Sequence, residues 1–273
     1  MAGGTGVQGV IFHPHYPKWL LGLFGGWWLV WAINPLMFHD FLLENVLTVV
    51  AAVLVIGTYR RFRLSNISYT LIFVYMCLHT VGAHYTYALV PYDQWFRSLF
   101  GISLTEPFGF RRNHYDRLVH FSFGLLIAYP IREIFLRIAN VRGAWGYYLP
   151  LDVTMSFSML YELLEWGAVA LFGGELGTAY LGTQGDEWDA HRDMALATFG
   201  AVLSMSTTAF INWKHSKRFG EEWWESLTIK ERRPLGEIRL REMLEESRSA
   251  PPASGEERQP DRATPGREEE DRS

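Results

Sequence analysis

The sequence predicts an all-α polytopic membrane protein, a bundle of about six transmembrane helices. Between residues 19 and 213 the chain contains six apolar runs, and a spanning helix needs roughly 20 mostly apolar residues. Hydrophobic residues make up 49% of the chain and aromatic residues 15%. The tail beyond residue 213 is instead rich in Glu, Arg, Pro and Ser, so the mean hydropathy of zero averages two unlike parts.

Each run is expected to form one spanning helix, in chain order. The predicted spans are 19–37, 41–59, 67–90, 118–138, 149–172 and 193–213. In the first span, Gly22, Gly25 and Gly26 are expected to permit close helix packing. In the fourth, Pro130 is expected to kink or shorten the inner end. The fifth run carries two glutamates.

The parts outside the membrane domain 19–213 differ in composition. Residues 1–18 are an N-terminal segment, and 214–249 are predicted to be a cytoplasmic juxtamembrane amphipathic segment. Residues 250–273 lack the apolar content for a core and are predicted to be disordered. The net charge of −4 and the lack of a basic stripe argue against a nucleic-acid partner. Cys77 is the only cysteine, which excludes an intrachain disulfide and a cysteine-based metal site.

The orientation follows from basic residues in short loops, which stay cytoplasmic. With six spans, three basic segments fall on one side, whereas the loop 91–117, with four arginines, falls on the other. On balance both termini are predicted to be cytoplasmic. The basic residues of the three segments are Arg60, Arg61, Arg63, Arg132, Arg137, Arg142, Lys214, Lys217 and Arg218.

Ionisable residues gather at the outer ends of the last four spans. Each costs about 3 kcal/mol at the bilayer centre by insertion scales, so such residues pair, line a cavity or do chemistry. We expect one shared site. The candidate metal ligands are His79, His84, His114, Asp116, His120, Asp186, Asp189 and Asp193, and the candidate catalytic residues are Glu162 and Glu165.

Helical spacing refines this expectation. Asp116 and His120 are four residues apart and share a helix face, as do Glu162 and Glu165 at a spacing of three. His79 and His84 are five apart, so at most one of them faces the site unless the helix breaks.

Crowded carboxylates at low dielectric require protons, basic partners or a cation. Arg117 and Arg192 are near enough in sequence to be such partners, which would make the cluster a structural ion-pair network. Alternatively, imidazoles with carboxylates form the ligand set of a divalent metal ion, Zn, Mn or Fe. Outside this group, Glu44 could face the same interior, although a residue near a helix start is more often expected to satisfy local backbone or interfacial water. Asp40 is expected to lie in a solvated outer turn.

Four stretches carry a family resemblance. They are "LHTVGAHYTYA" (78–88), "RRNHYDRLVHFSFGLL" (111–126), "YELLEW" (161–166) and "GTQGDEWDAHRDM" (182–194). Together they resemble the YjdF-like bacterial inner-membrane proteins, a family of predicted membrane proteins of unassigned activity. The resemblance implies a multi-pass protein of the bacterial inner membrane and implies no substrate. Asp116 and His120 are also similar to an Asp-x-x-x-His element of VanZ-like membrane proteins.

The leading functional hypothesis is a metal-assisted hydrolase or transferase at the outer leaflet. A bound cation would lower the pKa of a water molecule for attack on a lipid-linked or envelope substrate, and Glu162 or Glu165 would act as general base. Two alternatives stay open: a cation- or proton-coupled transporter, and a non-catalytic scaffold in the bilayer.

Overall fold

The computed structural model describes residues 13–110, 112–172, 184–230, 232 and 234–249. The chain divides into two compact units, Met1–Leu227 and Thr228–Ser273. The described helices of the first unit are α2 Tyr16–Ala32, α3 Phe38–Thr58, α4 Asn66–His84, α5 Tyr92–Phe100, the 3-10 helix η1 Glu106–Phe108, α6 Tyr115–Ile138, α7 Trp145–Phe172, α9 Asp189–His215 and α10 Phe219–Ser226. The second unit contains α11 Leu235–Ser249.

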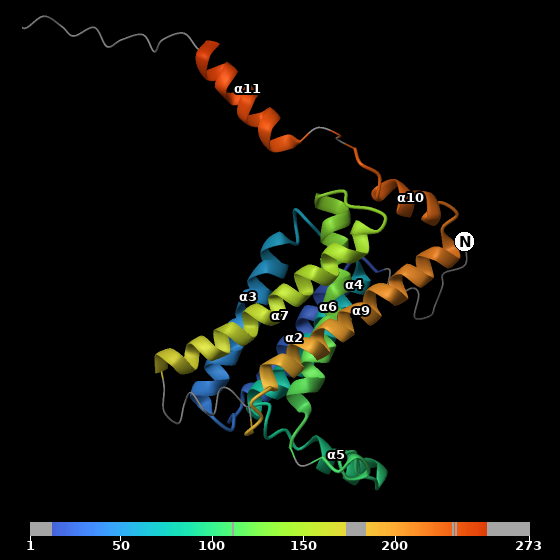
Figure 1. The fold of residues 1–273 in the computed structure, drawn as a ribbon. Helices are drawn as coiled ribbons and strands as arrows, with labels where there is room; N and C mark the ends of the chain where they lie inside the picture. Colours follow the sequence, from blue (N-terminus) through green and yellow to red (C-terminus); the bar gives the residue numbers. More distant parts are fainter. Residues whose placement is uncertain (1–12, 111, 173–183, 231, 233, 250–273) are drawn as a thin grey trace, which may run out of the picture. The chain divides into compact units, whose positions relative to one another are not determined.

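The all-α fold class is confirmed, because every regular element among the described residues is a helix. A long helix overlaps each of the six predicted spans, and the six lie alongside one another in Figure 1. Four of them, α3, α4, α6 and α9, are long and apolar enough to cross a membrane. The other two differ for separate reasons, since α2 has only 17 residues and α7 carries Asp152, Glu162 and Glu165.

One predicted helix end is wrong, and another is confirmed. The third span ends at His84 rather than residue 90, because Thr86 and Tyr87 have positive φ angles of 55° and 50°. Such angles belong to the left-handed region and cannot continue a right-handed helix. The fourth span is not shortened, since α6 continues through Pro130 to Ile138.

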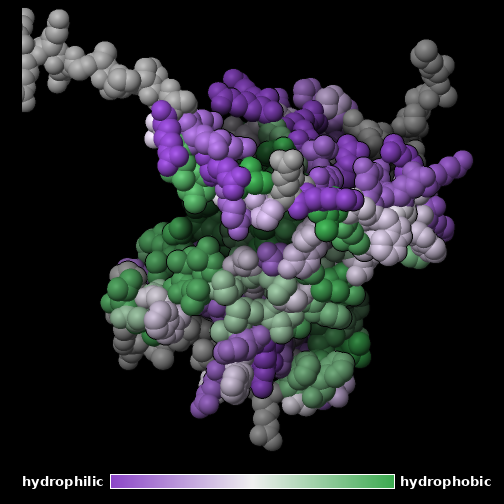
Figure 2. Space-filling view, turned by 45° about the horizontal axis from the view of Figure 1, so that its top comes forward, coloured by the Kyte–Doolittle hydropathy of each residue, from purple (hydrophilic) through white to green (hydrophobic). Residues whose placement is uncertain are grey.

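The outward faces of the long helices are apolar. On α3, for example, Leu42, Val46, Val49 and Val53 are exposed. Figure 2 shows continuous areas of hydrophobic side chains on the visible face of the protein. In a soluble monomer such large apolar patches are rare, but they suit contact with lipid acyl chains.

Helices α6 and α9 are packed backbone to backbone. A Cβ atom added to Gly124 of α6 would lie 1.8 Å from the carbonyl oxygen of Ala197, and one added to Gly200 of α9 would lie 2.2 Å from that of Phe121. Only glycine permits this approach, as in other small-residue contacts between membrane helices. The expectation for α2 is wrong, because a Cβ at Gly22, Gly25 or Gly26 would meet nothing within 4 Å.

The helices of the first unit have two chemically different ends. We define the basic end by the end of α3, the start of α4, the end of α6, the start of α7 and the end of α9. Here Glu133 of α6 accepts hydrogen bonds from the Ser65 backbone N–H (2.8 Å) and the Ser68 hydroxyl (2.6 Å), which join α6 to α4. Asn212 of α9 donates to the Tyr147 hydroxyl of α7 at 2.8 Å.

The opposite end, which we call the site end, comprises the starts of α3, α6 and α9 and the ends of α4 and α7. There the Tyr161 hydroxyl of α7 donates to Glu44 Oε2 of α3 at 2.9 Å. His79 Nε2 of α4 donates to the Glu44 carbonyl oxygen at 3.2 Å. Alternate helix directions therefore bring the acidic residues of separate segments to one end.

Candidate functional site

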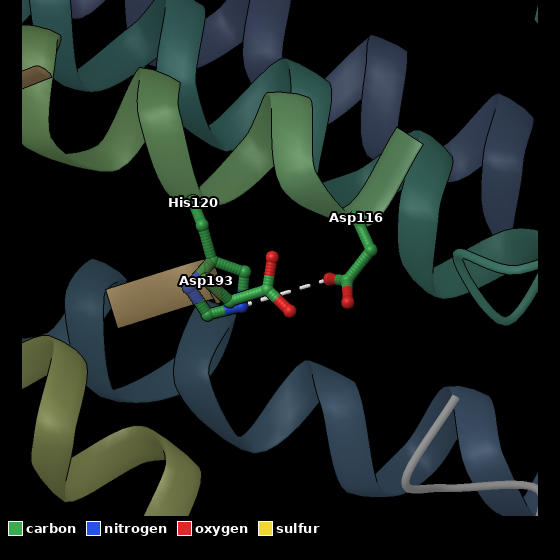
Figure 3. Close-up of side chains that lie close together, drawn as sticks. All are labelled: Asp116, His120 and Asp193. Atoms are coloured by element: carbon green, nitrogen blue, oxygen red, sulfur yellow. Dashed lines mark ion pairs between the residues drawn. The ribbon is translucent and has the colours of Figure 1, made fainter. Parts of the chain in front are cut away.

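Asp116, His120 and Asp193 form a compact group, which we call the cation triad. Asp116 and His120 lie one turn apart at the start of α6, and Asp193 lies in the second turn of α9. One possible ligand atom from each residue lies within 4.8 Å of the other two. Figure 3 shows the three side chains pointing toward one another, with the ion pair between His120 Nε2 and Asp116 Oδ1 at 3.6 Å. The close contact of α6 and α9 sets this arrangement.

Glu162 adds a fourth donor from α7. Its Oε1 atom lies 3.4 Å from His120 Nε2. Ligands of one tetrahedral zinc ion lie roughly 3.3 to 3.6 Å apart, given metal–ligand bonds of about 2.0 to 2.2 Å. The separations of His120 from Asp116 and Glu162 match this spacing. Glu162 itself lies outside the group of three residues whose ligand atoms are all within 4.8 Å of one another.

Two buried oxygen atoms at this site lack hydrogen bonds. Asp193 is 2% exposed, and neither its Oδ1 atom nor Glu162 Oε1 has a hydrogen-bond partner among the described residues. A buried polar atom without a partner costs free energy, and in native proteins it calls for an explanation such as an ion. A cation between the triad and Glu162 would satisfy both oxygen atoms.

A second group of charges, which we call the arginine layer, borders the triad. It consists of Arg112, Arg117 and Arg192 with Asp186 and Asp189. Arg112 forms a two-pronged ion pair with Asp189, with Nη1–Oδ1 at 2.6 Å and Nη2–Oδ2 at 3.1 Å. Asp189 is one helical turn before Asp193 on α9, so the layer lies toward the helix starts.

The predicted ligands Asp186 and Asp189 therefore lie in the arginine layer, and the remaining histidines are engaged with the backbone. His79 bonds to the Glu44 carbonyl through Nε2 and accepts from the Tyr87 hydroxyl through Nδ1. His84 Nδ1 donates to the carbonyl of Trp31 at 2.7 Å. His114 Nδ1 donates to that of Arg112 at 2.9 Å.

Glu165, the second predicted catalytic residue, lies one turn beyond Glu162 on α7 and is half-buried. Its charge interacts with those of Asp116, Glu162 and Glu44. It therefore belongs to the same electrostatic environment as the triad, although it is not among the three residues of the compact group.

The sequence interpretation missed two acids on α3. Asp40 and Glu44 are each 4% exposed, rather than solvated or at the interface. Arg112 was also not recognised as the main partner of Asp189. A periodicity signal existed for the acids, since Asp40 and Glu44 are four residues apart and share one helix face.

Two groups outside the spanning helices, His114 and Asp186, have pKa values below their usual ranges. Burial lowers the pKa of His114, and the charges of Arg117 and Arg112 act in the same direction. For Asp186, burial acts to raise the pKa, but the hydrogen bond from the Trp188 backbone N–H and the arginine partners outweigh it and hold the pKa below its usual range. His114 is therefore neutral and Asp186 charged at neutral pH.

Comparisons with known proteins agree with the membrane character of these helices. Residues 16–214, well over half of the chain, match the family described as "Predicted membrane protein (DUF2238)". The chain is also similar to "Inner membrane protein YjdF" of Escherichia coli (strain K12), with 38% identity over 186 residues that cover 67% of this chain and 85% of the relative. No solved structure matches the chain.

Proposed function

Since the chain belongs to the DUF2238 family of predicted membrane proteins, we propose that it is a multi-pass protein of the bacterial inner membrane that binds a divalent cation at the site end. The resemblance to the YjdF-like family is confirmed by both comparisons. The proposed activity is metal-assisted hydrolysis or group transfer on a lipid-linked or envelope substrate.

Six spanning helices are part of this proposal. Besides the four apolar helices, α2 packs on α4, and α7 packs on both α6 and α9. The 17 residues of α2 are at the lower limit of length for a spanning helix, and the 28 residues of α7 are more than a span requires. Glu162 and Glu165 of α7 are at the site end, whereas Asp152 is exposed near the start of the helix.

The proposed orientation places the basic end in the cytoplasm and the site end toward the periplasm, with both termini cytoplasmic. The nine Lys and Arg residues of the three basic segments outnumber the arginines at the site end. Among the residues that the structure describes, those at the site end are Arg97, Arg112, Arg117 and Arg192.

The observation that carries the cation site is a pair of buried oxygen atoms, Asp193 Oδ1 and Glu162 Oε1, that have no hydrogen-bond partner within the part of the chain that the structure describes. Both lie beside His120, whose imidazole is a good ligand for Zn, Mn or Fe. A network that only joined helices would satisfy its buried oxygen atoms with donors, because leaving them unpaired costs about 1 to 3 kcal/mol each.

The chemistry follows from this donor set. Asp116, His120 and Asp193 would hold the cation, which would supply Lewis-acid chemistry when bound. Glu162 would act as the general base, accepting a proton from an attacking water molecule as the oxygen of that water forms a bond to the electrophilic centre of the substrate. As the bond to the leaving group breaks, Glu162 would return the proton to the departing oxygen. Glu165 is the second candidate base.

Metal analysis of the full chain, purified in detergent, tests this proposal. We expect about one Zn, Mn or Fe ion per wild-type chain, as a single site requires. D193N and H120A should each lose most of it, because they remove a ligand. D152N, which changes an exposed carboxyl at the start of α7, is the matched control and should retain the ion. A wild-type protein without stoichiometric metal, or a D193N protein that binds as well as D152N, would contradict the cation site.

A further inference from the structure

The arginine layer contains more positive charge than its own carboxylates balance. Three guanidinium groups, from Arg112, Arg117 and Arg192, face the two carboxylates of Asp186 and Asp189. Arg112 and Arg117 are largely buried, with side chains 14% and 16% exposed. Arg192 is 53% exposed, so solvent also reaches this layer. Holding arginines together in such a layer requires anions, and the carboxylates of Asp186 and Asp189 supply them here.

All three guanidinium groups converge on one atom, Asp186 Oδ2. Arg117 Nη2 lies 2.7 Å from it, Arg112 Nη1 lies 3.3 Å from it, and Arg192 Nη1 also contacts it. A carboxylate can present only two oxygen atoms to these three guanidinium groups. A tetrahedral phosphate presents three, and guanidinium groups bind phosphate oxygens through paired N–H donors.

Asp186 is placed so that its side chain can leave without unfolding a helix. It lies in the turn before α9, where its Oδ1 atom accepts from the Trp188 backbone N–H at 3.1 Å. Two helices, α6 and α9, also begin beside the layer, and their N-terminal dipoles favour a bound anion. The position of Asp186 is thus the position that an external anion would take.

We propose that the three guanidinium groups form a binding site for the phosphate monoester of the substrate, and that Asp186 occupies this site while substrate is absent. This inference rests on the proposed function and names its substrate class. The phosphate would take the place of the Asp186 carboxylate, beside Asp189, which lies one helical turn before Asp193. Arginine and a divalent cation are the groups that stabilise charge on a phosphoryl centre.

The decisive experiment measures binding of inorganic phosphate to the full chain in detergent by calorimetry, without added metal. D186N keeps the size and the Oδ1 acceptor of the side chain but removes its charge. Because it removes a competing internal anion, we expect phosphate binding at least about tenfold tighter than in wild type. E187Q removes one negative charge from the neighbouring exposed residue and is the matched control, with unchanged affinity. If D186N binds neither inorganic phosphate nor phosphatidic acid better than E187Q does, the inference is overturned.

A loss of affinity is expected from the arginines. R117Q should weaken phosphate binding about tenfold or more, since it removes a charged donor. R192Q is the second variant in case R117Q does not fold, because the Arg192 side chain is 53% exposed and supports less of the structure. Unchanged phosphate binding in a folded R117Q protein, or in R192Q, would count against the site.

Two further arms identify the source of the phosphate and separate this inference from the cation proposal. Nanodiscs that contain phosphatidic acid are compared with nanodiscs of phosphatidylcholine alone. Binding only to phosphatidic acid indicates a lipid headgroup, and equal binding of inorganic phosphate indicates a soluble substrate; both support a phosphate monoester. Failure of phosphate and phosphatidic acid to bind any variant overturns it. Mn²⁺ binding is measured on the same samples. If no Mn²⁺ binds, the proposed function is contradicted, whereas the phosphate affinity of D186N still decides whether the phosphate site exists.

Discussion

Glu133 and Asp193 are both carboxylates on long apolar helices, one at each end of the first unit. At the basic end, Glu133 accepts from Ser65, Ser68 and the Arg137 guanidinium, and both of its oxygen atoms are hydrogen-bonded. At the site end, Asp193 is 2% exposed and its Oδ1 atom has no hydrogen-bond partner among the described residues.

This comparison distinguishes a carboxylate that stabilises helix packing from a carboxylate that is available to bind an ion. A carboxylate whose oxygen atoms all have donors holds helices together and has no capacity left for an ion. A buried carboxylate that lacks donors weakens the apo protein and is retained where it binds something. The same residue class thus has opposite effects on stability at the two ends.

The largest expected effect comes from removing each acid in turn. E133A should lower the free energy of unfolding in detergent by about 2 to 3 kcal/mol, because Ser65, Ser68 and Arg137 lose their acceptor. D193A, in metal-free protein, should leave the free energy of unfolding unchanged or raise it by about 1 kcal/mol, because a buried carboxyl group that lacks hydrogen-bond donors among the described residues is removed. Thermal unfolding with a chelator present measures both. If D193A lowers the free energy of unfolding as much as E133A does, the proposed difference between the two ends is wrong.

A smaller effect should come from the glycines that hold α6 against α9. G200A places a methyl group against the Phe121 carbonyl and should cost about 1 to 3 kcal/mol of unfolding free energy, as overpacking does. It should also weaken metal binding, because it separates Asp193 from His120. G22A on α2 is the matched control, since its methyl group meets nothing within 4 Å. Equal stability of G200A and G22A would show that α6 and α9 do not pack as described.

The smallest effect concerns pH and the segment between α4 and α6. Partial burial acts to raise the pKa of Asp93, but hydrogen bonds from Arg97, from the Leu104 and Thr105 backbone and from Ser103 outweigh it and hold the pKa below its usual range. A lowered folded pKa gives stabilisation that is present above the unfolded value of about 3.9 and is lost as pH falls through the folded value.

Amide hydrogen exchange at Leu104 and Thr105, corrected for intrinsic rates, should therefore be slow from pH 7 to about pH 5 and faster below about pH 4. D93N should show fast exchange already at pH 6, and D152N should behave as wild type. Protection that persists in D93N would show that Asp93 does not order this segment.

The sequence was sufficient for the helices and for the end at which the acids meet. Long apolar runs identify spanning helices by length alone, and the alternating direction of successive helices places Asp116, Glu162 and Asp193 at one end. The VanZ-like similarity, the disordered tail and the predicted transport and scaffold alternatives stay predictions.

The sequence alone could not show which acids are candidate cation ligands and which pair with arginines. This division depends on how α6 is rotated against α9, and that rotation is set by Gly124 and Gly200. In the sequence these glycines look no different from Gly22 or Gly25, which pack against nothing. Hydropathy and spacing describe one helix at a time, whereas each of these outcomes is a property of two helices in contact.

The close contact between α6 and α9 also imposes an order on biogenesis. Asp116 and His120 leave the ribosome well before Asp193, because the whole of α7 separates the two helices. Until α9 inserts, the backbone groove around Gly124 is unfilled and the polar groups of α6 lack their companion. Helix α9 therefore completes the cation triad, and a nascent chain that stops before Asp189 would present quality-control proteases with polar side chains stranded in lipid.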